Sequence, residues 1–509
     1  MSPAAENRGP ITLGIMLAAV MSALDTTVAN VALPHMQGNL SASPEQITWV
    51  LTSYMVAAAV TTPVTGWLAA RVGLKPMLLV AVAGFSLISV LCGLATSLPE
   101  MVVFRALQGM LAAPLLPLGQ SVLLNINPPE RYGRAMAIFT VAGVVAPAVG
   151  PVVGGYLTED LSWRWCFYIN LPAGIASILL LAIFMPKEPR QKRPFDFLGF
   201  GSLAIAVAAL QLLLDRGPTQ DWFSSREIWV EAILTLSAFW IYVTHTVTAR
   251  HPLFHPALAR DRNFVSTTVF GFFLSTLAYA SMSLLPLLMQ GLLGYPVIWS
   301  GLLSMPRGVV MMVMTLLVGR LDTLVDRRLL VACGVTIMTA GFWQMTQFDL
   351  GMGGDRIVLA TVAQGLGQGM VFVPLTTLAF ATMAPELRAD ASAINNLLRN
   401  LGGSVGISLM QALLSVNGQA MHAALAARAI PGDPVLVAGL PAALSPRTTA
   451  GALALNDEIT RQASMVAFID DFRLMVLIGV CSLPLILLLR QPRRLGAAPI
   501  EAAAEAHAG

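Results

Sequence analysis

The sequence predicts an all-α polytopic membrane protein with fourteen transmembrane helices, and two observations carry this prediction. Of the 509 residues, 56% are hydrophobic and only 11% are charged, whereas about a quarter of the residues in a soluble protein are charged. In addition, many stretches of roughly 20 apolar residues lie between polar breaks, and each is long enough to cross a bilayer as a helix. The mean hydropathy of +0.73 fits this class. The net charge of +3 and the scattered basic residues give no indication of nucleic-acid binding.

Polar breaks define the fourteen predicted spans. They are residues 11–33, 46–69, 77–96, 100–125, 134–157, 165–185, 196–214, 228–248, 264–290, 297–319, 329–348, 356–382, 392–416 and 468–490. An even number of spans places both termini on the same side of the membrane. Most of the 30 Lys and Arg residues fall on the cytoplasmic side if the N-terminus is inside, as the positive-inside bias requires. We therefore expect a multi-pass protein with both termini in the cytoplasm.

Short similarities between the two halves of the chain indicate an internal repeat. Gln108-Gly109 recurs as Gln364-Gly365, and Pro129-Glu130 recurs at the same offset as Pro385-Glu386. The repeated segments also occupy equivalent places in the helix order. Parallel repeats of this kind occur in transporters, whose substrate site lies near the interface of the repeats. The sequence therefore predicts two six-helix bundles in the same orientation, with a two-helix insert between them.

This repeat divides the chain into four parts. The predicted parts are an N-terminal bundle (1–186), an inserted hairpin with flanking loops (187–262), a C-terminal bundle (263–490) and a cytoplasmic tail (491–509). The C-terminal bundle contains one long outer segment, 417–467, which is rich in Ala, Pro and Gly. We expect this segment to be an exposed loop, either a cover over the outer mouth or a contact for a partner protein.

Several motifs resemble those of one transporter family. They are "LDTTVANVALP" (24–34), "GWLAARVGLK" (66–75), "FRALQGMLAAP" (104–114), "GVVAPAVGPVVGG" (143–155), "SWRWCFYINLP" (162–172) and the outer hairpin "LDRGPTQDWFSSREI" (214–228). Together they resemble the major facilitator superfamily, its fourteen-span drug:proton antiporter branch, and within that branch the EmrB-type multidrug efflux pumps. One departure is Ala70, which stands where the superfamily loop usually has an Asp.

The resemblance implies a major facilitator fold and proton-coupled export of hydrophobic drugs and toxic compounds across a bacterial inner membrane by alternating access. It also implies two partners, an EmrA-type periplasmic adaptor and a TolC-type outer-membrane channel. No cofactor is expected beyond the proton as coupling ion. The alternative within transport is an exporter dedicated to one metabolite, lipid or siderophore.

Asp25 is a single acid in the middle of the first predicted span. A carboxylate at a helix centre costs about 2.5–3.5 kcal/mol on insertion scales, so it normally faces the bundle interior or a wet cavity. Helix rise places Asp25 and Arg105 at similar depths below the outer surface. We therefore expect the two side chains to pair, and the resemblance implies that this pair couples transport to protons. The alternative is a permanent buried salt bridge without a role in transport.

Two glycine-rich motifs are candidates for conformational change. Residues 66–75 contribute Gly66, Arg71, Gly73 and Lys75, and the predicted fifth helix contributes Gly143, Pro147, Gly150, Pro151, Gly154 and Gly155. Small residues four apart let another backbone approach closely, and proline bends a helix. We expect the fifth helix to form a seam between the two bundles, where they rock; tight packing alone is the alternative.

Other polar residues within spans are candidates for a substrate cavity. They are Asn30, Gln108, Gln120, Arg307, Gln364, Gln368 and Arg399. Such side chains line cavities or bridge neighbouring helices by hydrogen bonds. The two arginines either hold anionic substrates or bind backbone carbonyls.

The sequence disfavours a membrane enzyme, the alternative from another class. The histidines have no metal-ligand spacing, no nucleophile accompanies a base, and no phosphate-binding Gly-Lys loop occurs. We therefore expect no metal site and no ATP-driven step.

Overall fold

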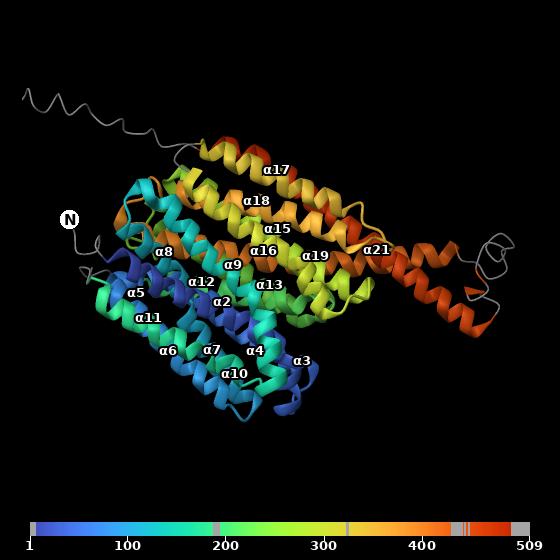
Figure 1. The fold of residues 1–509 in the computed structure, drawn as a ribbon. Helices are drawn as coiled ribbons and strands as arrows, with labels where there is room; N and C mark the ends of the chain where they lie inside the picture. Colours follow the sequence, from blue (N-terminus) through green and yellow to red (C-terminus); the bar gives the residue numbers. More distant parts are fainter. Residues whose placement is uncertain are drawn as a thin grey trace, which may run out of the picture.

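The computed structural model describes residues 7–186, 194–321, 325–428, 441, 444–445 and 448–489. It is 87% helical, and the described residues contain no β-strand. Long helices lie roughly side by side, with the N-terminal helices gathered on one side of the molecule and the C-terminal helices on the other (Figure 1). The predicted all-α fold is confirmed.

The first bundle is built from the N-terminal third of the chain. Its helices are α2 (Arg8–Asn39), α3 (Pro44–Ile47), α4 (Trp49–Thr61), α5 (Thr65–Val72), α6 (Leu74–Leu94), α7 (Leu98–Ala112), α8 (Leu115–Ile126), α9 (Tyr132–Tyr156), α10 (Trp165–Tyr168) and α11 (Asn170–Phe184). The pairs α4–α5 and α7–α8 each form a single membrane-length segment. Pro114 interrupts the second of them, because proline supplies no backbone N–H.

The insert and the second bundle follow. The insert consists of α12 (Phe197–Arg216) and α13 (Arg226–Thr248). The second bundle consists of α14 (Ala257–Arg260), α15 (Arg262–Leu287), α16 (Val297–Leu321), α17 (Arg327–Met345), α18 (Gly354–Phe380), α19 (Arg388–Arg428) and α21 (Thr449–Ser482). The predicted start of the insert at residue 187 and the predicted tail 491–509 lie outside the described residues.

Side-chain caps fix where several helices begin. Ser97 precedes α7, Asp196 precedes α12 and Asp261 precedes α15, and each accepts a hydrogen bond from a first-turn backbone N–H. Such caps satisfy donors that the helix itself leaves unpaired. Gly73 separates α5 from α6 with a φ of 103°, a conformation that favours glycine. The sharp change of direction in the motif 66–75 therefore depends on Gly73.

The predicted count of fourteen spans is not confirmed. Among the described residues, twelve helices are long and apolar enough to cross a membrane. Helices α9 and α19 occupy the places of the fifth and thirteenth predicted spans but are not among the twelve. In α19 the charged residues Arg388, Asp390 and Arg399 lower the apolar character of the segment.

The segment 417–467 differs from the predicted loop. Helix α19 continues to Arg428, and α21 begins at Thr449. The two helices extend beyond the ends of the other helices as a projecting pair (Figure 1). Runs of Ala favour helix strongly, which explains why a segment interpreted as loop from its Pro and Gly content is helical over most of its length. The described helical parts of this segment project away from the bundles (Figure 1).

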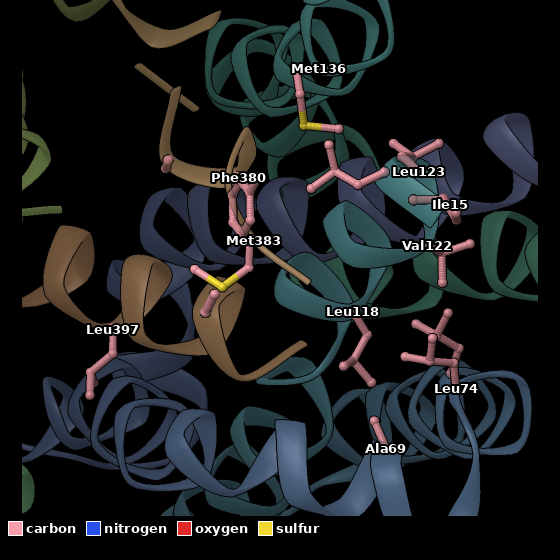
Figure 2. Packing of buried hydrophobic residues seen from close by; sticks show 14 of the residues in the cluster. Ile15, Ala69, Leu74, Leu118, Val122, Leu123, Met136, Phe380, Met383 and Leu397 are labelled. Atoms are coloured by element: carbon pink, nitrogen blue, oxygen red, sulfur yellow. The ribbon is translucent and has the colours of Figure 1, made fainter. Parts of the chain in front are cut away.

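One apolar cluster joins the two bundles at a single end of the molecule. It includes Leu118 and Met136 of the first bundle and Phe380, Met383 and Leu397 of the second, all of them buried. Figure 2 shows Phe380 and Met383 near Met136 and Leu118, with Leu397 farther to one side. A separate apolar cluster fills the interior of the second bundle. The bundles are therefore in close contact at the end that is predicted to face the cytoplasm.

Candidate proton-coupling site

Asp25 and Arg105 form an ion pair inside the first bundle. Nη1 of Arg105 on α7 lies 2.5 Å from Oδ2 of Asp25 on α2, and both side chains are 0% exposed. Helix rise places the two residues at similar depths, and the structure brings their side chains into contact. Neither side chain points toward lipid.

Two amides complete the contacts of the carboxylate. Gln108 donates from Nε2 to Oδ1 of Asp25 at 2.9 Å, and Asn170 donates from Nδ2 to the same oxygen at 2.8 Å. Asn170 is the first residue of α11 and also donates to the hydroxyl of Ser89 on α6. The carboxylate is thus held by donors from α7 and α11, and it connects α2 to both of these helices. Buried charges require such partners.

The guanidinium of Arg105 is held by more than its acid. Its Nε donates to the backbone carbonyl of Val50 at 3.1 Å, and its Nη1 also donates to Oε1 of Gln108 at 2.8 Å. The ring of Tyr54 lies 4.3 Å from the guanidinium carbon and the ring of Phe167 lies 5.7 Å from it. Cation–π contacts of this kind strengthen when they are desolvated. Arg105 therefore keeps partners even when the charge of Asp25 is neutralised.

This arrangement is suited to proton binding. A buried ion pair is stable only while both partners are charged, because removing one leaves an uncompensated charge. Protonation of Asp25 cancels its charge and weakens its hold on Arg105, Gln108 and Asn170 together. The helices that these residues join, α2, α7 and α11, can then rearrange. A proton at one oxygen is thereby linked to the packing of the bundle.

Asn170 and Tyr54 were not among the predicted site residues. Both are polar side chains inside predicted spans, which is the signal that identified Gln108, and both lie in the segments that face α2. Their roles depend on contacts between helices far apart in sequence.

The second bundle contains a further buried acid, Asp471 on α21. Its side chain is 0% exposed, and its two carboxylate oxygens have no hydrogen-bond partner among the described residues.

The predicted cavity residues of the first bundle fall in three different environments. Gln108 belongs to the Asp25 network, and Asn30 lies exposed on α2. Gln120 is buried, and its Oε1 accepts hydrogen bonds from Ser392 at 2.6 Å and from Asn396 at 3.2 Å. Because both donors are on α19, Gln120 joins the two bundles.

In the second bundle Arg307 and Gln364 lie close together. Arg307 donates from Nη2 to the backbone carbonyl of Ala278 at 3.2 Å and from Nη1 to the hydroxyl of Ser281 at 3.5 Å. Ser281 in turn donates to Oε1 of Gln364 at 2.7 Å. No carboxylate of the described residues pairs with Arg307. Of the two alternatives left open for this arginine, contact with a backbone carbonyl is thus present.

Gln368 and Arg399 complete the predicted set. Gln368 is buried, and its Nε2 has no partner among the described residues. Arg399 on α19 lies with its guanidinium carbon 4.6 Å from the ring of Phe372. Since Gln364, Gln368 and Phe372 are four residues apart, they share one face of α18. That face leads from Arg307 toward Arg399.

The two networks are related by the internal repeat. The offset that relates Gln108 to Gln364 also relates Asp25 to Ser281, and in both bundles these residues contact each other. A Cβ on Gly109 would overlap the backbone carbonyl of Tyr54, and a Cβ on Gly365 would overlap that of Arg307. The repeat is therefore present in three dimensions. Only the first bundle carries a carboxylate at this position.

One residue of the motif 66–75, Gly66, lies where the bundles meet. A Cβ on Gly66 would overlap Asp390 of α19, so this glycine allows α5 and α19 to approach closely. Lys75 donates to the backbone carbonyls of Ala182 and Met185 at 2.7 and 2.6 Å. Arg71 lies over the ring of Trp67 at 5.6 Å. Gly66 thus belongs to the inter-bundle contact, whereas Lys75 fixes the end of α11.

The glycine face of α9 has a different neighbour from the one predicted. A Cβ on Gly150 would overlap Thr27, and a Cβ on Gly154 would lie 3.3 Å from the Cα of Val28, so both face α2 within the first bundle. Helix α9 as a whole does lie between the bundles, because it also packs against α16 and α18 of the second bundle, and Ala137 meets Gly319 there. Gly143 and Gly155 have open space around them. The side chains of Pro147 and Pro151 lie outside the described residues.

Gly109→Ala is expected to destabilise the first bundle. The added Cβ meets the backbone of α4, which cannot yield as a flexible side chain would, and overpacking costs about 1–3 kcal/mol. Thermal unfolding of the purified protein in detergent measures the effect. Gly143→Ala is the matched control, since its Cβ meets nothing within 4 Å. Equal melting temperatures for the two variants would contradict the close approach of α4 and α7.

Comparison with known proteins places this architecture in one family. A sequence profile described as Major Facilitator Superfamily matches residues 15–407. The chain belongs to the major facilitator superfamily. The predicted fold and the predicted resemblance are therefore confirmed, and members of this superfamily are transporters. The chain is a multi-pass membrane protein.

Individual members of the superfamily resemble the chain closely. The multidrug export protein EmrB of Escherichia coli K12 is 36% identical over 415 residues, which cover 81% of each chain. The fatty acid resistance protein FarB of Neisseria gonorrhoeae is 35% identical over 491 residues, covering 95% of this chain and 96% of FarB. The crystal structure of the human organic anion transporter MFSD10 has a TM-score of 0.60 at 14% identity, covering 94% of this chain and all of that structure. The last similarity concerns the fold alone.

Proposed function

We propose that the chain exports hydrophobic compounds in exchange for protons, with Asp25 as the residue that binds the proton. The observation that carries the proposal is the buried pair of Asp25 and Arg105 in the middle of the first bundle. An acid embedded in a membrane costs free energy and is therefore found mainly at functional sites, and this one has a partner that its protonation releases. The relatives include a multidrug export protein and a fatty acid resistance protein, which supports hydrophobic compounds as the class of substrate.

The proposed cycle is alternating access. In this conformation the bundles are held together at the end predicted to be cytoplasmic. Close packing at Gly66 and hydrogen bonds of Gln120 and Arg388 make this contact. Arg388 on α19 donates to Oδ1 of Asn125 at 2.9 Å and to the carbonyl of Leu124 at 3.2 Å. Protonation of Asp25 loosens α2 against α7 and α11, and the bundles then rock about their interface. One charge that crosses 100 mV carries about 2.3 kcal/mol, which is sufficient for a tens-fold accumulation of substrate.

The proposed surroundings rest on the resemblance of the sequence motifs to EmrB-type pumps and on the positive-inside bias of Lys and Arg. We infer a bacterial inner-membrane location with both termini in the cytoplasm. We further infer an EmrA-type periplasmic adaptor and a TolC-type outer-membrane channel as partners. The projecting pair of helices formed by the ends of α19 and α21 would then lie on the periplasmic side.

Transport into proteoliposomes under an imposed pH gradient tests the proposal. The panel contains an uncoupler, a cationic dye, a medium-chain fatty acid and a polar metabolite. Accumulation of several hydrophobic compounds that collapses with the gradient is the expected result. Accumulation of the fatty acid alone would favour the second candidate, a dedicated exporter, which is supported by the coverage of FarB. Transport that is indifferent to the gradient would contradict proton coupling.

Gln120→Leu is expected to favour the state that is open to the cytoplasm. The change removes the hydrogen bonds to Ser392 and Asn396 across the bundle interface. Loss of about 1 kcal/mol shifts a two-state equilibrium about fivefold. Spin labels on cysteines at the exposed positions of Glu130 and Glu386, in a background without the native cysteines, report the distance between the bundles.

The control for this variant is Asn127→Ala. Asn127 donates only within its own bundle, to the carbonyl of Leu123 at 2.9 Å. Its removal should leave the distance distribution unchanged, whereas Gln120→Leu should add longer distances. Identical distributions in both variants would show that the Gln120 contacts do not hold the bundles together.

A further inference from the structure

A basic cavity lies where the insert joins the second bundle. It has a volume of about 680 Å³ and is bordered by Arg250, His251 and His255 from the segment after α13, and by Arg260 at the end of α14. The segment lies at the end of the molecule that is predicted to face the cytoplasm. The proposed transport cycle makes no use of this cavity.

The walls of the cavity are fixed by the fold. Asp196 caps α12 by accepting from the N–H of Gly199 at 2.8 Å, and it also contacts Nε2 of His245 at 2.8 Å and accepts from the N–H of Leu253 at 3.0 Å. Leu253 and Leu258 are buried in the apolar cluster that joins the bundles. The segment between α13 and α15 is therefore anchored on both of its sides, and its basic side chains are presented from a defined backbone.

The basic side chains that line the cavity are available to bind an anion. Arg250 and Arg260 are exposed, and neither forms an ion pair within the described part of the chain. His255 accepts at Nδ1 from the N–H of Ala257, at 3.2 Å, so that its Nε2 carries the proton and is a donor. Asp261, the acid at the edge of the cavity, is occupied by the N–H of Phe264 at 3.0 Å and by the hydroxyl of Thr382.

An apolar surface begins beside these charges. Helix α13 packs mainly on α12 and leaves most of its own surface uncovered. Trp240 is 70% exposed, and Val247, one residue before the end of α13, is 82% exposed. Phe197 at the start of α12 is 79% exposed. Exposed apolar side chains on a membrane-length helix are expected to face the hydrocarbon region, and the cavity next to their cytoplasmic end is then expected at the level of the lipid headgroups.

We propose that this cavity binds the phosphate headgroup of an anionic phospholipid, whose acyl chains lie along α13 and the start of α12. Arg250 and Arg260 supply charge, and Nε2 of His255 supplies a directed hydrogen-bond donor. Basic pockets at the cytoplasmic side of membrane helices bind anionic headgroups in this way. The apolar surface beside the cavity selects a lipid over free phosphate. A lipid bound here bridges α13 and the second bundle, which share little direct packing.

Native mass spectrometry of the full-length protein in detergent tests the proposal. The protein is incubated with dioleoylphosphatidylglycerol or dioleoylphosphatidylcholine, and retained lipid is counted across a concentration series. Preferential retention of phosphatidylglycerol is expected, with about a fivefold weaker apparent affinity for each arginine removed in Arg260→Gln and in the double variant Arg250→Gln/Arg260→Gln. The matched control is Arg131→Gln, an exposed arginine on the same predicted side but away from the cavity.

A further arm adds inorganic phosphate or glycerol phosphate as competitor. The proposal requires that millimolar competitor displaces little phosphatidylglycerol, because the acyl chains contribute to binding. Equal retention of the two lipids would overturn the proposal, and so would equal loss in Arg131→Gln and Arg260→Gln. Full displacement by inorganic phosphate would assign the cavity to a soluble anion and would overturn the lipid assignment. None of these measurements depends on transport activity.

Discussion

Asp25→Asn is expected to abolish pH-driven export while the protein still folds and binds its substrates. The amide resembles the protonated acid in shape and charge, which is a state that the proposed cycle itself visits. Arg105 retains the carbonyl of Val50, Oε1 of Gln108 and the ring of Tyr54, so that its charge stays partly compensated. Proteoliposome transport under a pH gradient measures the loss, and binding of a fluorescent substrate to purified protein measures what remains.

Asp471→Asn provides the comparison. Asp471 is as deeply buried as Asp25, but no Arg or Lys side chain pairs with it among the described residues. We expect this variant to keep pH-driven export. The reverse outcome, with export retained in Asp25→Asn and lost in Asp471→Asn, would move the proton site from the first bundle to the second.

Arg105→Ala is expected to cost the most stability of any single substitution in the site. It leaves the carboxylate of Asp25 buried without its cation, and removing one partner of a buried ion pair costs about 3–5 kcal/mol. The packing on Tyr54 and Phe167 is lost as well. Unfolding of the purified protein in mixed micelles measures the free energy, and export should be lost in parallel.

Two further variants identify the cause of this loss. The double variant Asp25→Asn/Arg105→Gln removes both charges and should recover most of the stability but none of the pH-driven export. Arg356→Ala breaks an exposed ion pair with Asp349 at the connection between α17 and α18, in which the arginine side chain is 54% exposed, and surface pairs contribute at most about 1 kcal/mol. If Arg356→Ala and Arg105→Ala destabilised the protein equally, burial of the Asp25–Arg105 pair would not be the source of its strength.

Much of the fold was predictable because a bilayer imposes simple requirements. Each span needs a long apolar helix, so the helices could be placed from composition and polar breaks alone. The pairing of Asp25 with Arg105 was also predictable, since helix rise sets depth and buried charges need partners. The family followed from motifs that the superfamily profile matches.

The remaining features depend on which helix faces which, and rotation about a helix axis is set by packing against its neighbours. The sequence could not show that Gly150 faces α2 instead of the second bundle, because a flat glycine side fits any close neighbour. Nor could it show that Gln108 binds Asp25 while Gln120 binds Ser392, since both are amides inside spans. In segment 417–467 the Pro and Gly content suggested a loop, while the flanking runs of Ala form helix.

The sequence by itself determined that this chain is a membrane-embedded helical transporter of the major facilitator superfamily with one paired acid in its first helix. Only the tertiary structure decided what surrounds that acid and its arginine: the amides of Gln108 and Asn170 and the ring of Tyr54. Only the structure, too, shows that Ser281 contacts Gln364 at the repeat-related place in the second bundle. The physical reason is that depth in the membrane depends on position along one helix, whereas hydrogen-bond partners depend on the relative rotation of several.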